Sequence, residues 1–295
     1  MKLRELGEDR LLERLTRNLA TNRAVVAGPG DDCALVRFPG SDQLLVLKTD
    51  CVVENVHFTA ETKATDVGWK AMARPLSDMA AASARPQFAL VTILAPATTD
   101  VARLTAIYRG LTRAAKRFEV AIVGGELSAT DGPLSLSVTI TGCVEDERRV
   151  GRGGGEAGDE LFVTGHLGGS IRGKHVRFTP RLAEARWLTS RFNVHAMMDL
   201  SDGLGADLPR LARRSGVGFE LDRTAIPRTR GCSIEQAISD GEDYELLFAI
   251  APRDAPKLSR DWARKFPRLP LTRIGRLIEQ GTKKTRRLGG YVHFA

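Results

Sequence analysis

The stretch Ala196-Met197-Met198-Asp199-Leu200-Ser201-Asp202-Gly203 decides the fold class, because two kinds of secondary structure meet in it. The apolar run 196–200 is typical of a buried strand, and acidic residues follow at its carboxyl end. Helical spacing then covers residues 203–214, and Ser215-Gly216 ends it. A strand that passes through acidic residues into a helix indicates an α/β protein.

Strand and helix patterns alternate outward from this stretch in both directions. Pro75 is expected to kink the helix 66–84 or split it into two. In the strand 134–140 apolar residues alternate with serine and threonine, so one face should be buried. The other predicted strands are 43–48, 88–94, 120–123, 161–164, 244–250 and 271–277, and the other predicted helices are 100–118, 181–191 and 255–266.

A charged and then glycine-rich segment, residues 145–159, is expected to be the hinge between two domains. A chain of 295 residues is long for one hydrophobic core. The sequence therefore predicts two α/β halves: an N-terminal domain of residues 1–148 and a C-terminal domain of residues 149–295.

Composition disfavours several classes of protein. The net charge of +8 is spread over helices, and an aromatic content of 6% offers few stacking platforms, so nucleic-acid binding is not expected. No apolar run approaches the roughly 20 residues of a membrane span, and the N-terminus is charged, so a cytoplasmic protein is expected. The four cysteines lie far apart, which disfavours a zinc site.

Carboxylates recur at strand ends and in glycine-flanked turns. Each alone could cap a helix or form a turn. Together they would repel one another at one edge of a sheet unless a cation lay among them, and magnesium prefers such oxygen ligands. No P-loop motif is present. The acidic positions are Asp31-Asp32, Asp50, Asp78, Glu126, Asp199, Asp202 and Glu242-Asp243.

Eight short motifs occur in the order found in a known family. The chain resembles the thiamine-monophosphate kinases of the aminoimidazole-ribonucleotide synthetase superfamily over nearly its whole length. The motifs are Gly30-Asp31-Asp32-Cys33-Ala34, Thr49-Asp50, Asn55-Val56-His57-Phe58, Leu76-Ser77-Asp78-Met79-Ala80-Ala81, Gly124-Gly125-Glu126, Gly158-Asp159, Asp199-Leu200-Ser201-Asp202-Gly203-Leu204 and Gly241-Glu242-Asp243-Tyr244-Glu245-Leu246.

The resemblance implies a two-domain fold with mixed sheets packed by helices, a homodimer, and an N-terminal domain that binds ATP and magnesium and forms the dimer. If that dimer forms, the apolar face of the strand 134–140 is expected to lie against the sheet of a second subunit. It implies phosphorylation of thiamine monophosphate to the diphosphate by in-line transfer from ATP, with Mg²⁺ as the cofactor. No residue is assigned as a general acid or base, because a phosphate nucleophile is already deprotonated at neutral pH.

The resemblance also implies roles for particular residues. The implied metal ligands are Asp32, Thr49, Asp50, Asp78, Glu126, Asp199 and Asp202. The implied ATP contacts are Gly125, Glu126, Arg152 and Ser201, and the implied contacts to thiamine monophosphate are His57 and Glu242.

Some positions depart from the family pattern. Lys48 replaces a serine or threonine, Pro75 an asparagine, and Glu126 an aspartate. Leu288 replaces a tryptophan that stacks on thiamine in the family. These departures leave two alternatives open: a related ATP-dependent kinase or synthetase with another small-molecule substrate, and a nucleotide-binding protein that has lost turnover.

Overall fold

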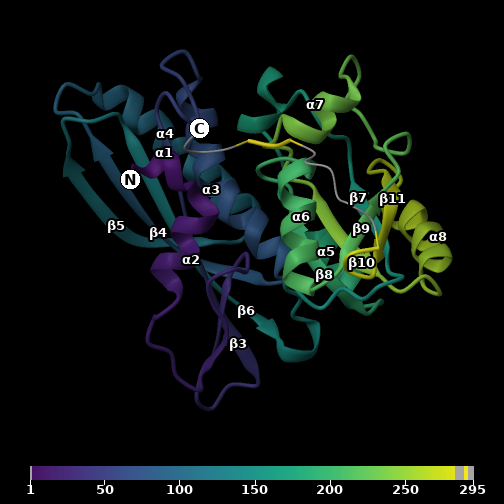
Figure 1. Cartoon of the computed structure of the whole chain (residues 1–295). Coiled ribbons are helices and arrows are strands. Elements are labelled where there is room, and N and C mark those ends of the chain that lie inside the picture. The colour runs from purple at the N-terminus through teal and green to yellow at the C-terminus, as the bar shows by residue number, and fades with distance from the viewer. Residues whose placement is uncertain (1, 283–288, 292–295) are drawn as a thin grey trace.

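Two β-sheets, one in each half of the chain, organise the structure. The computed structural model describes residues 2–282 and 289–291. Figure 1 shows the two halves side by side, with helix α3 (Ala64–Ala81) between them. In the described part of the chain, no helix combines the length and the apolar character that a membrane crossing requires.

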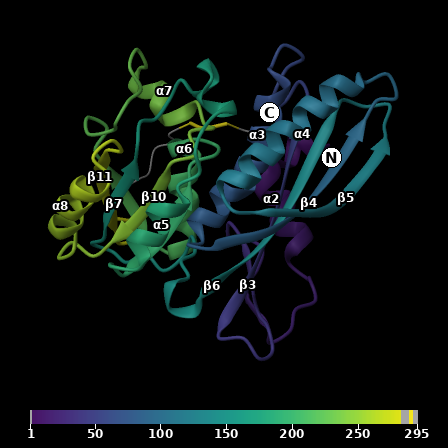
Figure 2. The same cartoon turned by 180° about the vertical axis from the view of Figure 1, so that it is seen from behind.

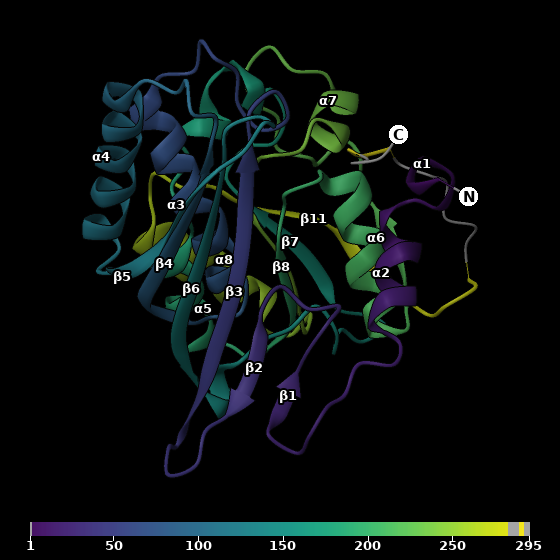
Figure 3. The same cartoon turned by 90° about the vertical axis from the view of Figure 1, so that its left-hand side faces the viewer.

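The sheet of the N-terminal half has the strand order β1-β2-β3-β6-β4-β5. It is mixed, because β4 and β5 are parallel while the other neighbours are antiparallel. Helices α3 and α4 cover one face (Figure 2), and the other face is turned to the viewer in Figure 3. The elements of this half are α1 (Leu3–Leu6), α2 (Glu8–Thr16), β1 (Val25–Ala27), β2 (Ala34–Arg37), β3 (Gln43–Val53), α3, β4 (Arg85–Ala95), α4 (Val101–Arg117), β5 (Ala121–Ala129) and β6 (Ser135–Glu145).

Helix α3 is the central element of the fold. Almost all of its side chains are buried, and it packs on both the N-terminal sheet and the C-terminal half. Of the two outcomes predicted at Pro75, a kink or a split, the split is wrong, because the helix runs unbroken past this residue. Packing on all sides of α3 outweighs the one backbone hydrogen bond that proline removes.

Strand β6 has the alternation of apolar and polar residues that the sequence predicts, but its apolar face packs in the hydrophobic core of the same chain. Leu136, Val138 and Ile140 are fully buried in the core beneath α3. The prediction that a second subunit covers this face is therefore wrong, since a helix of the same chain already does.

The sheet of the C-terminal half is antiparallel, with the strand order β8-β10-β7-β11-β9. Along β10 (Leu246–Ile250), Leu247 packs in the core cluster with α6, and Phe248 packs in the cluster with α5 and α8. Helices therefore cover both faces, which explains the uninterrupted apolar run in this strand. The other elements are β7 (Glu160–Thr164), α5 (Leu182–Thr189), β8 (Val194–Asp199), α6 (Leu204–Ser215), β9 (Gly218–Leu221), α7 (Ile234–Ser239), α8 (Ala255–Lys265) and β11 (Leu271–Ile278), with short 3₁₀ turns at Asp146–Arg148, Ser170–Arg172 and Lys174–Val176.

Candidate active site

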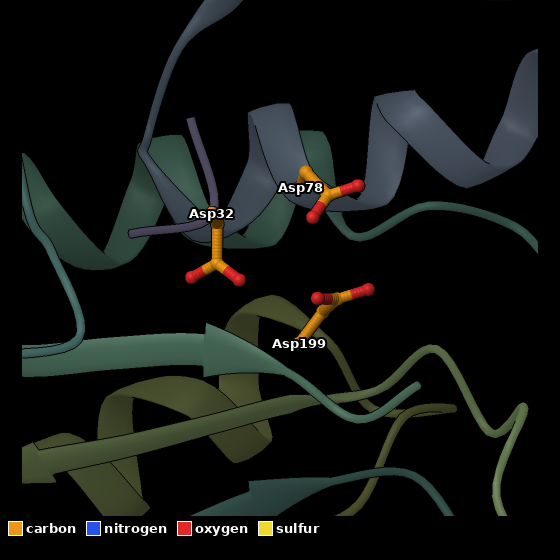
Figure 4. A group of neighbouring side chains, drawn as sticks. All are labelled: Asp32, Asp78 and Asp199. Carbon is orange, nitrogen blue, oxygen red and sulfur yellow. The ribbon is translucent and has the colours of Figure 1, made fainter. Parts of the chain in front are cut away.

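Three aspartates from distant parts of the sequence meet between the two halves. Asp32 lies in the turn before β2, Asp78 lies in the last turns of α3, and Asp199 is the last residue of β8. Carboxylate oxygens of the three lie within 4.8 Å of one another, and all three residues are buried (Figure 4). We call these residues the aspartate cluster.

Burial and mutual repulsion both act against ionisation of the cluster. Burial raises the pKa of Asp78 well above its usual value, and burial together with the charge of Asp32 raises the pKa of Asp199 to about 6. Groups that lose their hydration and face like charges need a cation nearby to stay charged. The cluster is therefore suited to holding a positive ion.

Two side chains of the protein supply part of that positive charge. Lys48 Nζ lies 2.8 Å from Asp78 Oδ1. Arg152 donates to Asp32 Oδ1 from Nη2 at 2.6 Å and from Nε at 3.0 Å. Three carboxylates thus face two cations, so one negative charge stays uncompensated.

One oxygen of the cluster has no hydrogen-bond partner. Asp32 Oδ2 is buried, and no donor in the described part of the chain reaches it. A buried acceptor without a partner is costly unless an ion or water satisfies it. Because magnesium binds carboxylate oxygens at about 2.1 Å and keeps other sites for water and phosphate, the donor set of the cluster fits this ion.

A cleft with a volume of about 630 Å³ opens beside the cluster. Its lining residues include Lys48 and Arg152, which contact the cluster, and Gly30, Ser201 and Asp202. This volume lies in the range of small-molecule sites. The cleft is also lined by charged residues of α2 and by the arginines of α6: Glu8, Asp9, Glu13, Arg210, Arg213 and Arg214.

The turn that carries Ser201 and Asp202 is held by a residue that the sequence interpretation missed. Asp207 is fully buried in α6 and accepts the backbone N–H groups of Ser201 at 3.1 Å and Asp202 at 3.0 Å. Arg210 bridges Asp207 and Asp202, at 3.0 Å and 2.5 Å. The three-residue spacing of Asp207 and Arg210 on a helix was the available signal.

Strand β3 directs its predicted site residues to opposite faces of the sheet. Asp50 lies on the α3 side, where Asp50 Oδ2 is 3.8 Å from Arg74 Nε. Thr49 is hydrogen-bonded through Oγ1 to Ser137 and Thr139 of β6. Since side chains alternate along a strand, the structure brings Asp50 near the cluster but directs the Thr49 side chain away from it.

The Gly125-Glu126 pair lies on the edge strand β5. Glu126 pairs with Thr92 of β4 and accepts a hydrogen bond from Ser128. Strands β6 and β4 lie between β5 and β3, which places Glu126 roughly 14 Å from β3. The structure does not bring it to the cluster. A Cβ on Gly125 would lie 1.8 Å from the Val91 carbonyl oxygen, so glycine is needed here for close strand packing.

His57 and Glu242 are joined by a buried lysine that the sequence interpretation also missed. Lys70 in α3 donates to the His57 carbonyl oxygen at 2.6 Å and to Glu242 Oε2 at 2.8 Å. Glu242 is in the left-handed region at φ 53°, which is unusual for this residue type. The two predicted substrate contacts thus belong to one region, although their motifs lie far apart in sequence.

Comparison with known proteins agrees with this architecture. Residues 30–144 match the N-terminal domain and residues 152–286 the C-terminal domain of AIR synthase related proteins. Thiamine-monophosphate kinase from Rhodopirellula baltica is 42% identical, with 86% of this chain and 84% of that protein covered. The chain belongs to the thiamine-monophosphate kinase family.

Further members of the thiamine-monophosphate kinase family extend the match along the chain. The enzyme from Aquifex aeolicus is 33% identical, with 95% of this chain and 94% of that protein covered. The solved structure of AaThiL complexed with AMPPCP and TMP superposes with a TM-score of 0.84 at 31% identity and covers 99% of each chain. The expected two-domain α/β fold is therefore confirmed, with a mixed sheet in the N-terminal half and an antiparallel sheet in the C-terminal half.

The departures from the thiamine-monophosphate kinase pattern fall in different places. Pro75 is inside α3, and Lys48 contacts Asp78. Glu126 is on the edge strand. Leu288, which replaces the stacking tryptophan, lies outside the described residues.

Proposed function

We propose that this chain transfers the γ-phosphoryl group of ATP to thiamine monophosphate, with magnesium as the cofactor. The observation that carries the proposal is the aspartate cluster, with its unpartnered oxygen on Asp32, beside a cleft lined by Arg152, Ser201 and Asp202. The relatives of this chain are thiamine-monophosphate kinases, and the structure of one of them, AaThiL, has been solved with AMPPCP and TMP.

The residues of the site divide into two groups by their place in the structure. Asp32, Asp78 and Asp199 would hold magnesium, with Asp50 near the cluster and Asp202 in the wall of the cleft. Arg152 and Ser201 face the cleft where the phosphates of ATP would lie. His57 and Glu242 would contact thiamine monophosphate. The family resemblance also implies roles for three residues that lie away from the cluster, and these roles stay proposals: Thr49, whose side chain takes the other face of β3, and Gly125 and Glu126 on the edge strand β5.

The protein acts mainly by orientation and charge. Bound magnesium would neutralise the phosphates and favour in-line attack. Asp32 fixes the Arg152 guanidinium at the wall of the cleft, and Asp207 fixes the backbone of the turn with Ser201. Groups held in place before the reaction need no reorganisation during it, which is the source of electrostatic catalysis.

Binding of ATP should depend strongly on magnesium. Without the metal, the triphosphate would approach three carboxylates that carry a net negative charge even after Lys48 and Arg152 are counted. Calorimetry in millimolar magnesium and in EDTA should show an affinity at least about a hundredfold lower in EDTA. Equal affinities would exclude the aspartate cluster as the metal site.

We also propose that the chain forms a homodimer. Two further proposals are that it acts in the cytosol and that its domain boundary lies at residues 148/149. Phe88, Leu90 and Leu94 of β4 are 49%, 47% and 40% exposed on the face of the N-terminal sheet opposite α3. Their alternation with buried Ala89, Val91 and Ile93 gives an apolar outer face suited to a second copy of the sheet.

The assembly is tested by Leu90→Lys. Light scattering should give twice the chain mass for the unmodified protein and a shift toward monomer for the variant, because a charge would be buried at the interface. A monomer at all concentrations of the unmodified protein would contradict the proposal.

A further inference from the structure

Lys48 occupies a position between the aspartate cluster and the cleft. It lies on β3 next to Thr49, but its side chain takes the opposite face and reaches Asp78 of α3. The lysine side chain is 20% exposed and the Asp78 side chain 9%. Because Lys48 also lines the cleft, its ammonium group adjoins both the carboxylates and the space where phosphates would lie.

The ammonium group competes with a metal ion for Asp78. A protonated lysine has three donors and no lone pair, so it cannot be a metal ligand. Lys48 Nζ already forms an ion pair with Asp78 Oδ1 at 2.8 Å. A divalent ion on Asp78 Oδ1 would therefore face a positive charge at close range, where Coulomb repulsion is strong.

The balance of charges in the cluster also indicates that a metal ion binds at Asp32 more readily than at Asp78. Lys48 and Arg152 offset two of the three carboxylates, and the unpartnered acceptor is on Asp32 rather than on Asp78. An ion at Asp32 satisfies this acceptor. A further ion at Asp78 would have to displace an existing ion pair.

We propose that Lys48 is a built-in cation that takes the place of one magnesium ion, so that this chain binds one ion fewer per site than it would with a neutral residue at position 48. The ammonium neutralises Asp78 permanently and offers its remaining donors to a phosphate oxygen in the cleft. The inference rests on the proposed metal site and deepens it.

The test counts metal ions directly. Mn²⁺ serves as the probe, because its EPR signal distinguishes free from bound ion, and AMPPCP saturates the nucleotide site without turnover. The unmodified chain is compared with Lys48→Ser, Lys48→Gln and Lys48→Arg, and with the exposed control Lys116→Ser. Lys48→Gln keeps the length of the side chain and guards against misfolding of the serine variant.

The proposal predicts one additional bound Mn²⁺ per chain in Lys48→Ser and Lys48→Gln, and no change in Lys48→Arg or Lys116→Ser. Melting in EDTA should show lower stability for the two neutral variants, and Mn²⁺ should restore it. Equal stoichiometry in all variants would show that Lys48 moves aside for the metal, which overturns the inference and leaves the proposed function intact. Absence of bound Mn²⁺ in every variant would overturn both.

Discussion

Replacing Asp32 with asparagine is expected to lower the rate of phosphoryl transfer by about a thousandfold. The amide oxygen can still accept the hydrogen bonds of Arg152, which leaves the amide nitrogen where Oδ2 now lies. An N–H donor would then stand in place of the unpartnered acceptor of the cluster. The variant thus changes one charge and one acceptor while it keeps the shape of the side chain.

The neighbouring residue gives a matched control for this prediction. Asp31 accepts the backbone N–H of Arg152 at 2.7 Å and does not belong to the cluster. An asparagine at position 31 can make the same hydrogen bond, so Asp31→Asn should keep turnover within about tenfold. Steady-state kinetics with saturating magnesium and ATP make the comparison. Similar losses in the two variants would mean that the turn, rather than the cluster, determines activity.

Replacing Lys70 with methionine is expected to lower the free energy of unfolding by about 3–5 kcal/mol. Lys70 is fully buried and binds Glu242 and the His57 carbonyl oxygen. Methionine fills a similar volume but leaves a carboxylate and a carbonyl group without their donor. Urea unfolding of both proteins measures the difference.

Two further variants separate the ion pair from general effects of the substitution. Lys63→Met removes an exposed lysine before α3 and should change stability by no more than about 0.5 kcal/mol. Lys70→Met combined with Glu242→Gln should recover part of the loss, because a neutral side chain needs no counter-ion. If Lys70→Met alone stays within about 1 kcal/mol of the unmodified chain, the pair does not hold this region together.

Much of the fold could be predicted because apolar periodicity reflects local burial. The run of apolar residues in β10 is buried throughout, and the alternation of apolar and polar residues in β6 matches an alternation of burial along that strand. What covers a face is not a local property. The apolar face of β6 was expected to meet a second subunit, but a helix of the same chain can cover such a face equally well, and α3 does so in the structure. The continuity of α3 past Pro75 has the same origin.

The candidate site could be predicted in part for a similar reason. Asp199 ends a buried strand, so its place at a sheet edge followed from the pattern. That Asp32 and Asp78 would meet it depends on how α3 lies between the two halves, which no local pattern contains. Because side chains alternate between the two faces of a strand, the sequence could have shown that Lys48 and Asp50 lie on one face of β3 and Thr49 on the other. Asp207 and Lys70 gave weaker signals, because an acid or a lysine on a helix is usually solvated.

The transfer of label from ATP tests the central claim most directly. The purified chain is incubated with γ-³²P-labelled ATP, magnesium and thiamine monophosphate, and thiamine diphosphate is separated and counted. We predict that the label enters thiamine diphosphate in step with ADP release, that EDTA abolishes transfer, and that Asp32→Asn reduces it about a thousandfold while Asp31→Asn does not. ADP release without labelled thiamine diphosphate, or transfer that continues in EDTA, would contradict the account.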